Sequence, residues 1–209
     1  DIPWEIIYGP DDHLWITERY GMVSRISPET GERWIILDLT ESVHQSGESG
    51  LLGMVLHPDF ENLPYVYLAY TYYSGSSIKE RIVRFEYNDS ELLNVFILLD
   101  DIPGNTTHDG CRLLITPDLK LLITTGDAQN QPASQDLNSL NGKVLRLNLD
   151  GSIPDDNPWP GNPVYTYGHR NARGFTLHLT ESFIARNTDL PPMMSLILLR
   201  QEEIMAGPM

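Results

Sequence analysis

The sequence predicts an all-β fold of the β-propeller class, built from consecutive units of four short antiparallel strands. Three observations lead to this prediction. A Pro-Asp turn, a β-rich strand and a strand of pattern apolar-x-Arg-apolar follow one another three times; the strands are rich in Val, Ile, Tyr and Thr; and no long amphipathic helix appears through residue 175. Repeats of this kind, with variable loops between strands, are typical of propeller blades. A generic β-sandwich is the alternative, but its strands do not usually repeat one signature at blade spacing.

The repeat keeps the same order in each unit. The Pro-Asp pairs and the Arg-containing segments that follow them are Pro10-Asp11 with residues 23–26, Pro58-Asp59 with residues 82–85, and Pro117-Asp118 with residues 144–147. The Pro-Asp pairs lie 48 and 59 residues apart, which is about the length of one blade. A chain of 209 residues therefore provides three to four blades.

The end of the chain differs in composition. Only one of 19 aromatic residues and one of 16 glycines lie beyond residue 175, whereas four of six methionines lie in 193–209. The stretch "LPPMMSLILLRQEEIMAGPM" predicts a short helix begun by proline and ended near Gly207. We therefore expect a partial propeller over residues 1–175 and an aberrant tail over residues 176–209, which is frameshifted or helical.

Charge and composition exclude several classes of function. The formal charge is −15, from 29 acidic and 14 basic residues, so the chain repels nucleic acids and anionic membranes. Its apolar runs are too short to span a membrane. Cys111 is the single cysteine, which excludes an internal disulfide and a cysteine-based zinc site. The chain opens with Asp-Ile-Pro-Trp and shows no signal peptide, so we expect a leader or more to precede it.

His108 is the first candidate site residue. It stands in a Thr-Thr-His-Asp-Gly turn directly before the apolar strand of "THDGCRLLITPD". Such a turn favours an exposed imidazole, which titrates near neutrality and can remove a proton from a hydroxyl within hydrogen-bond reach. A histidine in a turn can equally be inert, so residue type alone leaves both interpretations open.

A glycine-rich loop, "HQSGESGLLGMVLHPDF", carries the second candidate. Its glycines permit close approach of the backbone, and Glu48 lies among them. Glu48 is either a solvated loop acid or a site residue. His57 precedes a Pro-Asp turn, and we interpret it as a cap of that turn rather than as a ligand.

Residues 126–163 form the third polar region. The region is dense in Asn, Asp, Gly and Pro, which build turns. Asp150, Asp155 and Asp156 lack the spacing and the closing glutamate of an EF-hand loop, so no metal ligands are assigned. We expect long inter-strand loops held by hydrogen bonds from side chains to the backbone.

The fourth region, "YGHRNARGF", carries Arg170 and Asn171 between glycines. Arginine offers a rigid fork of donors for carboxylate or carbonyl oxygen, and asparagine both donates and accepts. The pair suits an oxygen-rich ligand. The alternative is a structural arginine that ties loops together.

These loops, in this order, resemble the soluble quinoprotein glucose dehydrogenase and aldose sugar dehydrogenase family, the glucose/sorbosone dehydrogenase group. The segments that carry the resemblance are "PWEIIYGPDDHLWITER", "GLLGMVLHPDF", "HDGCRLLITPD", "GKVLRLNLDGSIPDDNP" and "YGHRNARGF", which together span nearly all of residues 2–175. The resemblance implies a six-bladed propeller that binds pyrroloquinoline quinone (PQQ) on its top face. It also implies oxidation of an aldose at C1 to the lactone, an external electron acceptor, and a periplasmic or extracellular location.

The resemblance further implies roles for five residues. His108 falls on the base that takes the proton from the C1 hydroxyl, and Arg170 falls on the arginine that stabilises negative charge at a quinone carbonyl. Asn171 falls on an asparagine that contacts the cofactor. Glu48 occupies a position near cofactor and sugar where the glucose enzyme has a glutamine, and Gln131 approximates a glutamine that contacts the substrate.

The chain departs from the family pattern in two further places. Thr107 stands where the glucose enzyme has an aspartate beside its base, so the surroundings of His108 are expected to differ. After Phe175 the text "TLHLTESFIARNTDLPPMMSL" matches none of the family's later blades, which by resemblance supply the ligands of the calcium on PQQ. We therefore expect PQQ and calcium as cofactors, with the calcium ligands outside this chain. We also expect impaired activity of residues 1–209 alone and self-association through open blade edges.

Two other functions stay open at this point. One is a non-catalytic propeller fragment that binds a sugar or a protein. The other is a calcium-dependent propeller hydrolase of the lactonase type, which uses paired acids and asparagines as metal ligands. The order of His108 before Arg170 and Asn171 argues against the hydrolase.

Overall fold

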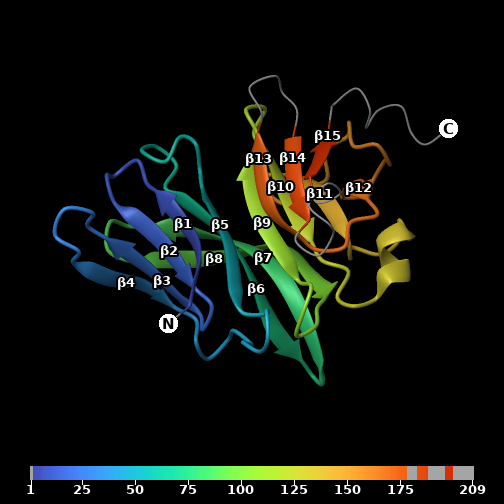
Figure 1. Cartoon of the computed structure of the whole chain (residues 1–209). Helices are drawn as coiled ribbons and strands as arrows, with labels where there is room; N and C mark the ends of the chain where they lie inside the picture. Colours follow the sequence, from blue (N-terminus) through green and yellow to red (C-terminus); the bar gives the residue numbers. More distant parts are fainter. Residues whose placement is uncertain (1, 178–182, 188–195, 200–209) are drawn as a thin grey trace. The chain divides into compact units, whose positions relative to one another are not determined.

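The computed structural model describes residues 2–177, 183–187 and 196–199. Its described elements are β-strands and a single 3-10 helix. The strands form three four-stranded sheets and one three-stranded sheet, all antiparallel (Figure 1). The predicted all-β class is therefore confirmed. The chain divides into two compact units, residues 1–107 and 108–209, which we describe in turn.

The first unit contains two sheets in which every strand lies beside its sequence neighbours. The strands are β1 (Pro3–Tyr8), β2 (Leu14–Glu18), β3 (Met22–Ile26) and β4 (Arg33–Asp38) in one sheet, and β5 (Leu51–Leu56), β6 (Tyr65–Ser74), β7 (Ser77–Tyr87) and β8 (Leu92–Pro103) in the other. The largely buried β5 packs against β1 and β2. Trp15 and Tyr87, one from each sheet, meet edge to face with ring centroids 4.9 Å apart. The core of this unit therefore lies between its two sheets.

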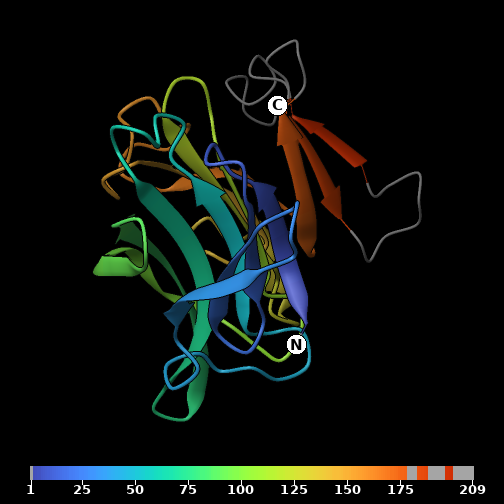
Figure 2. The same ribbon diagram turned by 90° about the vertical axis from the view of Figure 1, so that its left-hand side faces the viewer.

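The second unit contains the remaining two sheets. Its strands are β9 (Gly110–Ile115), β10 (Lys120–Thr125), β11 (Lys143–Asn148) and β12 (Val164–Tyr167) in one sheet, and β13 (Ala172–Leu177), β14 (Phe183–Asn187) and β15 (Leu196–Leu199) in the other. The 3-10 helix η1 (Gln131–Gln135) lies between β10 and β11. β13 packs against β9 and β10. Figure 2, turned by a quarter, again shows the three orange to red strands β13–β15 side by side.

The sequence repeat corresponds to equivalent strands. The three apolar-x-Arg-apolar segments lie on the third strand of each four-stranded sheet, with Arg25 on β3, Arg84 on β7 and Arg146 on β11. Each Pro-Asp pair lies in the turn between the first and second strands. The predicted equivalence of the three units is therefore confirmed.

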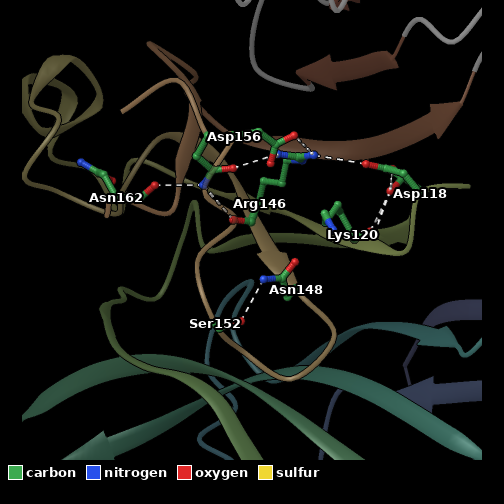
Figure 3. A network of polar contacts seen from close by, with 9 residues as sticks. Asp118, Lys120, Arg146, Asn148, Ser152, Asp156 and Asn162 are labelled. Carbon is green, nitrogen blue, oxygen red and sulfur yellow. Dashed lines mark hydrogen bonds and ion pairs between the residues drawn. The ribbon is translucent and has the colours of Figure 1, made fainter. Parts of the chain in front are cut away.

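In two of the sheets the third-strand arginine binds the Pro-Asp turn. Arg25 Nε donates to Asp11 Oδ2 at 2.5 Å. Arg146 Nη2 donates to Asp118 Oδ2 at 3.1 Å, and its Nη1 donates to Asp156 Oδ1 at 2.8 Å (Figure 3). The arginine thus joins the first turn of the sheet to its third strand, which explains why these two features recur together.

The middle sheet uses other contacts at the same positions. The guanidinium of Arg84 lies over the ring of Tyr65 at 4.3 Å and over the ring of Phe96 at 5.1 Å. In its Pro-Asp turn the backbone N–H of Asp59 donates to His57 Nδ1 at 3.1 Å. His57 is buried and caps the turn, as predicted.

The helix predicted near the end of the chain is wrong where the structure describes it. Residues 196–199 form β15, which pairs with β14, and β14 pairs in turn with β13. A short apolar run such as "LILL" has no periodicity that separates strand from helix, and here the edge of β14 supplies backbone partners. The rest of the helix prediction lies outside the described residues. The boundary at residue 175 and the frameshift stay predictions.

The loops of residues 126–163 are held as expected, by side chains that bond to the backbone. Asn157 Nδ2 donates to the carbonyls of Arg146 and Asn162 at 3.1 and 2.9 Å (Figure 3). Asn162 Nδ2 donates to the carbonyl of Leu137 at 2.9 Å. Across the residues described, no helix has the length and apolar character needed to cross a membrane.

Candidate active site

His108 and Asp127 form a hydrogen-bonded pair at one edge of the β9–β10 hairpin. In that hairpin Gly110 pairs with Thr125, and two further steps in the same register bring position 108 opposite position 127. His108 Nδ1 lies 2.8 Å from Asp127 Oδ1. Because a carboxylate only accepts, Nδ1 carries the proton and Nε2 carries the lone pair in the neutral imidazole.

The imidazole is largely buried, so the prediction of an exposed side chain is wrong. The side chain of His108 is 13% exposed and that of Asp127 is 1% exposed. Gly126 allows this close approach, because a Cβ at that position would lie only 1.7 Å from the carbonyl oxygen of His108. In this turn the imidazole ring of His108 therefore lies against Asp127 and not in solvent.

The backbone around the pair is held by hydrogen bonds and carries strain. The N–H of Gln129 donates to Asp127 Oδ1 at 2.9 Å, and the N–H of Ala128 donates to the carbonyl of His108 at 3.0 Å. His108, Ala128 and Gln129 have φ values of 61°, 48° and 62°, in the left-handed region that favours glycine. Strained residues of this kind cluster at functional sites, so their presence here supports a functional role for the pair.

The segment with Arg170 and Asn171 joins the same cluster. The N–H of Asp127 donates to the carbonyl of Arg170 at 2.7 Å. Asn171 is fully buried, forms a β-bridge with Gly126, and accepts a hydrogen bond from the N–H of Gly110 on Oδ1 at 3.1 Å. Arg170 is half-buried. The structure thus brings together three predicted site residues although 62 residues separate His108 from Arg170.

His169, the neighbour of Arg170, is buried and neutral. Its Nε2 lies 2.7 Å from Thr166 Oγ1. Burial, together with the positive charge of Lys143, lowers the pKa of His169 to about 4. His169 therefore adds no positive charge to the site at neutral pH.

The structure does not test two other predicted site residues. Gln131 begins η1 and is exposed, and within the described part of the chain no hydrogen bond joins it to His108 or Asp127. Glu48 belongs to the first unit, where its N–H donates to the carbonyl of Thr106 at 2.7 Å. The assignment of both residues to the site stays a prediction.

Asp127 and Lys143 were missed at the level of sequence. By resemblance the family has an aspartate at position 107, where this chain has threonine. The available signal was the hairpin register, because the residues that precede one antiparallel strand face those that follow the next. Lys143 had no signal, since a lysine at a strand start is ordinarily exposed. Its ammonium is fully buried.

No group of three or more His, Cys, Asp or Glu side chains suited to a metal ion occurs among the residues described. The donors gathered near His108 are of another kind. Arg170 and Asn171 carry guanidinium and amide N–H groups, which suit oxygen-rich anionic ligands.

Comparison with known proteins identifies the family. The model of the family described as Glucose / Sorbosone dehydrogenase matches residues 1–187, beyond the predicted boundary at residue 175. The chain belongs to this family. Glucose/sorbosone dehydrogenase relatives include quinoprotein glucose dehydrogenase B of Acinetobacter calcoaceticus, 39% identical over 82% of this chain and 43% of the relative. Aldose sugar dehydrogenase YliI of Escherichia coli is 30% identical over 85% of this chain and 51% of the relative.

A solved structure of the glucose/sorbosone dehydrogenase type gives the same result. The PQQ-bound form of aldose sugar dehydrogenase from Streptomyces coelicolor superposes with a TM-score of 0.81 and 34% identity, over 88% of this chain and 56% of that one. The present chain thus spans about half the length of the curated relatives it matches, 43% and 51% in the two cases above.

Proposed function

We propose that the protein to which these residues belong oxidises an aldose at C1 to the lactone, with PQQ as cofactor. The observation that carries the proposal is the buried His108–Asp127 pair, in a chain of the glucose/sorbosone dehydrogenase family. An external acceptor would reoxidise the cofactor. On the same resemblance we propose a periplasmic or extracellular location.

His108 acts as the general base in this proposal. Asp127 accepts the hydrogen bond of Nδ1–H and so keeps the lone pair on Nε2. Nε2 removes the proton of the C1 hydroxyl while the C1–H bond breaks with its electron pair and the C1–O bond becomes a carbonyl. Asp127 then faces an imidazolium, whose positive charge its carboxylate stabilises.

Arg170 and Asn171 are the residues that would hold the cofactor. When bound, PQQ would accept the hydride from C1, which carries two electrons. Its carboxylates and quinone oxygens are acceptors, which the guanidinium of the half-buried Arg170 fits. The amide of Asn171 is fully buried, so its contact with the cofactor is proposed on the resemblance alone. The guanidinium of Arg170 stabilises negative charge that develops during oxidation.

The remaining assignments rest on the resemblance alone. Glu48 and Gln131 would contact the sugar, with Glu48 also near the cofactor. Calcium is proposed as the second cofactor, with ligands outside residues 1–209. We therefore propose that residues 1–209 by themselves have little or no activity.

Reconstitution tests the proposal. The complete gene product and residues 1–209 are each supplied with PQQ and calcium, and dye reduction is measured with glucose and other aldoses. We expect turnover by the complete product, and His108→Ala should lower its kcat by about 10²–10⁴-fold. An unchanged kcat would remove His108 from the role of base.

A complete product that takes up no PQQ would favour the alternative, a non-catalytic module that binds a sugar or a protein. Saturable turnover by residues 1–209 would contradict the proposed impairment.

A further inference from the structure

Lys143 is a charged side chain in the core of the second unit. It begins β11, and its side chain is fully buried. Its Nζ donates to the backbone carbonyls of Ala133, Ser134 and Asn141 at 2.8, 3.0 and 2.6 Å. Three carbonyl acceptors match the three N–H donors of an ammonium group.

The charge of Lys143 is not neutralised by a contacting acid. Burial lowers its pKa to about 8, an effect that the Asp136 carboxylate opposes, so the ammonium is still the main form at pH 7. No salt bridge to Lys143 occurs within the described ranges of the chain. Burial of an ammonium is costly unless its donors are satisfied. Here backbone carbonyls satisfy them, so the ammonium fixes the path of the main chain.

The carbonyls that Lys143 binds belong to the loops of the site. The carbonyl of Ser134 also accepts the N–H of Gly168 at 2.8 Å. The carbonyl of Gly142 accepts a hydrogen bond from the N–H of His169 at 3.0 Å, and the N–H of Gly142 donates to the carbonyl of Gly126 at 2.8 Å. Arg170 directly follows His169 in the chain, and Asp127 directly follows Gly126. One buried ammonium thus lies where both backbone segments are anchored.

We propose that Lys143 is a positioning residue of the active site. Its ammonium fixes the segment with Arg170 relative to the segment with Asp127 and His108, and so sets the distance between the base and the group that stabilises negative charge. This inference rests on the proposed function. A lysine with a purely structural role would change only the global stability of the unit.

Hydrogen exchange of residues 1–209 tests the positioning without cofactor or sugar. In Lys143→Met, amide exchange of Gly168, His169 and Asp127 should rise at least ~10-fold. The acceptor of Gly168 is the Ser134 carbonyl that Lys143 binds, and the acceptors of His169 and Asp127, the carbonyls of Gly142 and Arg170, lie in the segments that this anchor holds. Amides of the β10–β11 ladder, such as that of Leu145, should keep their protection. Lys79→Met, a half-buried lysine in the first unit, serves as control and should change none of these amides.

Two outcomes would overturn the inference: unchanged exchange at the three amides, or a uniform rise in which the ladder amides take part. If Lys143→Met does not fold, Lys143→Gln keeps amide donors and should show the same local pattern at smaller amplitude. A uniform rise in that variant also overturns it.

Kinetics of the complete gene product provide the second measurement. Lys143→Met should lower kcat about 10-fold or more and change KM little, because misplacement of base and stabilising group affects the transition state more than binding. A loss of kcat that only matches the loss of folded protein would contradict a positioning role. A change confined to KM would contradict it as well. If the complete wild-type product oxidises no sugar, the proposed function fails, and the exchange experiment still decides the role of Lys143.

Discussion

At the scale of single residues, the site depends on contacts that neutralise or orient one side chain at a time. Asp127 orients His108, and its own oxygen is held by the N–H of Gln129. The neighbouring His169 is kept neutral by burial and by the charge of Lys143. The second unit thus contains two different histidines: His108, which a carboxylate orients, and His169, which its buried surroundings keep neutral.

Asp127→Asn should lower kcat of the complete enzyme by at least ~100-fold. The amide can donate to Nδ1, which moves the proton to Nε2 and removes the lone pair that accepts the sugar proton. Steady-state kinetics of the complete gene product measure this, with Asp155→Asn, an exposed acid in the loop after β11, as control. Equal kcat values for the two variants would show that Asp127 does not orient the base.

His169 should make the stability of residues 1–209 depend on pH. Its folded pKa of about 4 is below the ordinary 6.5, so between these values the unfolded chain binds more protons. Stability from the neutral ring is complete above about pH 6.5 and is lost as pH falls toward 4. A difference of this size corresponds to about 3 kcal/mol. Urea titrations from pH 7 to 4 should show a shallower loss for His169→Gln than for wild type. Parallel curves would contradict the assignment.

At the scale of elements, the site is made by loops that approach closely at glycines. Gly142 has a φ of +66°, and a Cβ there would lie 2.4 Å from the carbonyl oxygen of His169. Gly75, at the tip of the β6–β7 hairpin, has a φ of +63°, and a Cβ placed on Gly75 would have no atom within 4 Å. The two glycines share a backbone conformation and differ in crowding.

This pair separates backbone strain from loop packing. Gly75→Ala should cost only the strain of a left-handed residue, about 1–2 kcal/mol. Gly142→Ala should cost about 1–3 kcal/mol more, because the added methyl group collides with backbone. Urea denaturation of residues 1–209 measures both values. Equal costs would mean that the 142 turn and the His169 segment are not in the contact described.

At the scale of the whole molecule, each unit contains two packed sheets and presents sheet edges. β8 is the last strand of its sheet and exposes four apolar side chains in its first half: Leu93, Val95, Phe96 and Ile97. An exposed apolar edge can pair with another chain. Self-association of residues 1–209 is therefore proposed to occur through such edges.

Val95→Lys should reduce this association, because a charge on an edge strand opposes pairing with another chain. Sedimentation velocity over a range of protein concentrations measures the weight-average mass of each variant. Wild-type residues 1–209 should grow in mass with concentration, and Val95→Lys should grow less. Glu91→Lys, exposed just before β8, is the control for charge alone. A wild-type chain that stays monomeric would exclude edge pairing.

The sequence determined the local features of this protein. The alternation of β-formers and Pro-Asp turns predicted the sheets, and the repeated arginines marked the third strand of each, because strands and turns depend on near neighbours. His108, Arg170 and Asn171 were identified from their residue types and from resemblance to the family. The described strands of the tail were not predicted, since their short apolar runs have no distinctive period.

Tertiary structure decided the contacts between segments that are distant in sequence. The pairing of His108 with Asp127 depends on the hairpin register, and the burial of His108 depends on the space left by Gly126. The three carbonyls around Lys143 come from a 3-10 helix and a turn whose approach no local pattern specifies. Partners and burial are properties of the folded neighbourhood, and the charge state of a buried ring or ammonium follows from that neighbourhood alone.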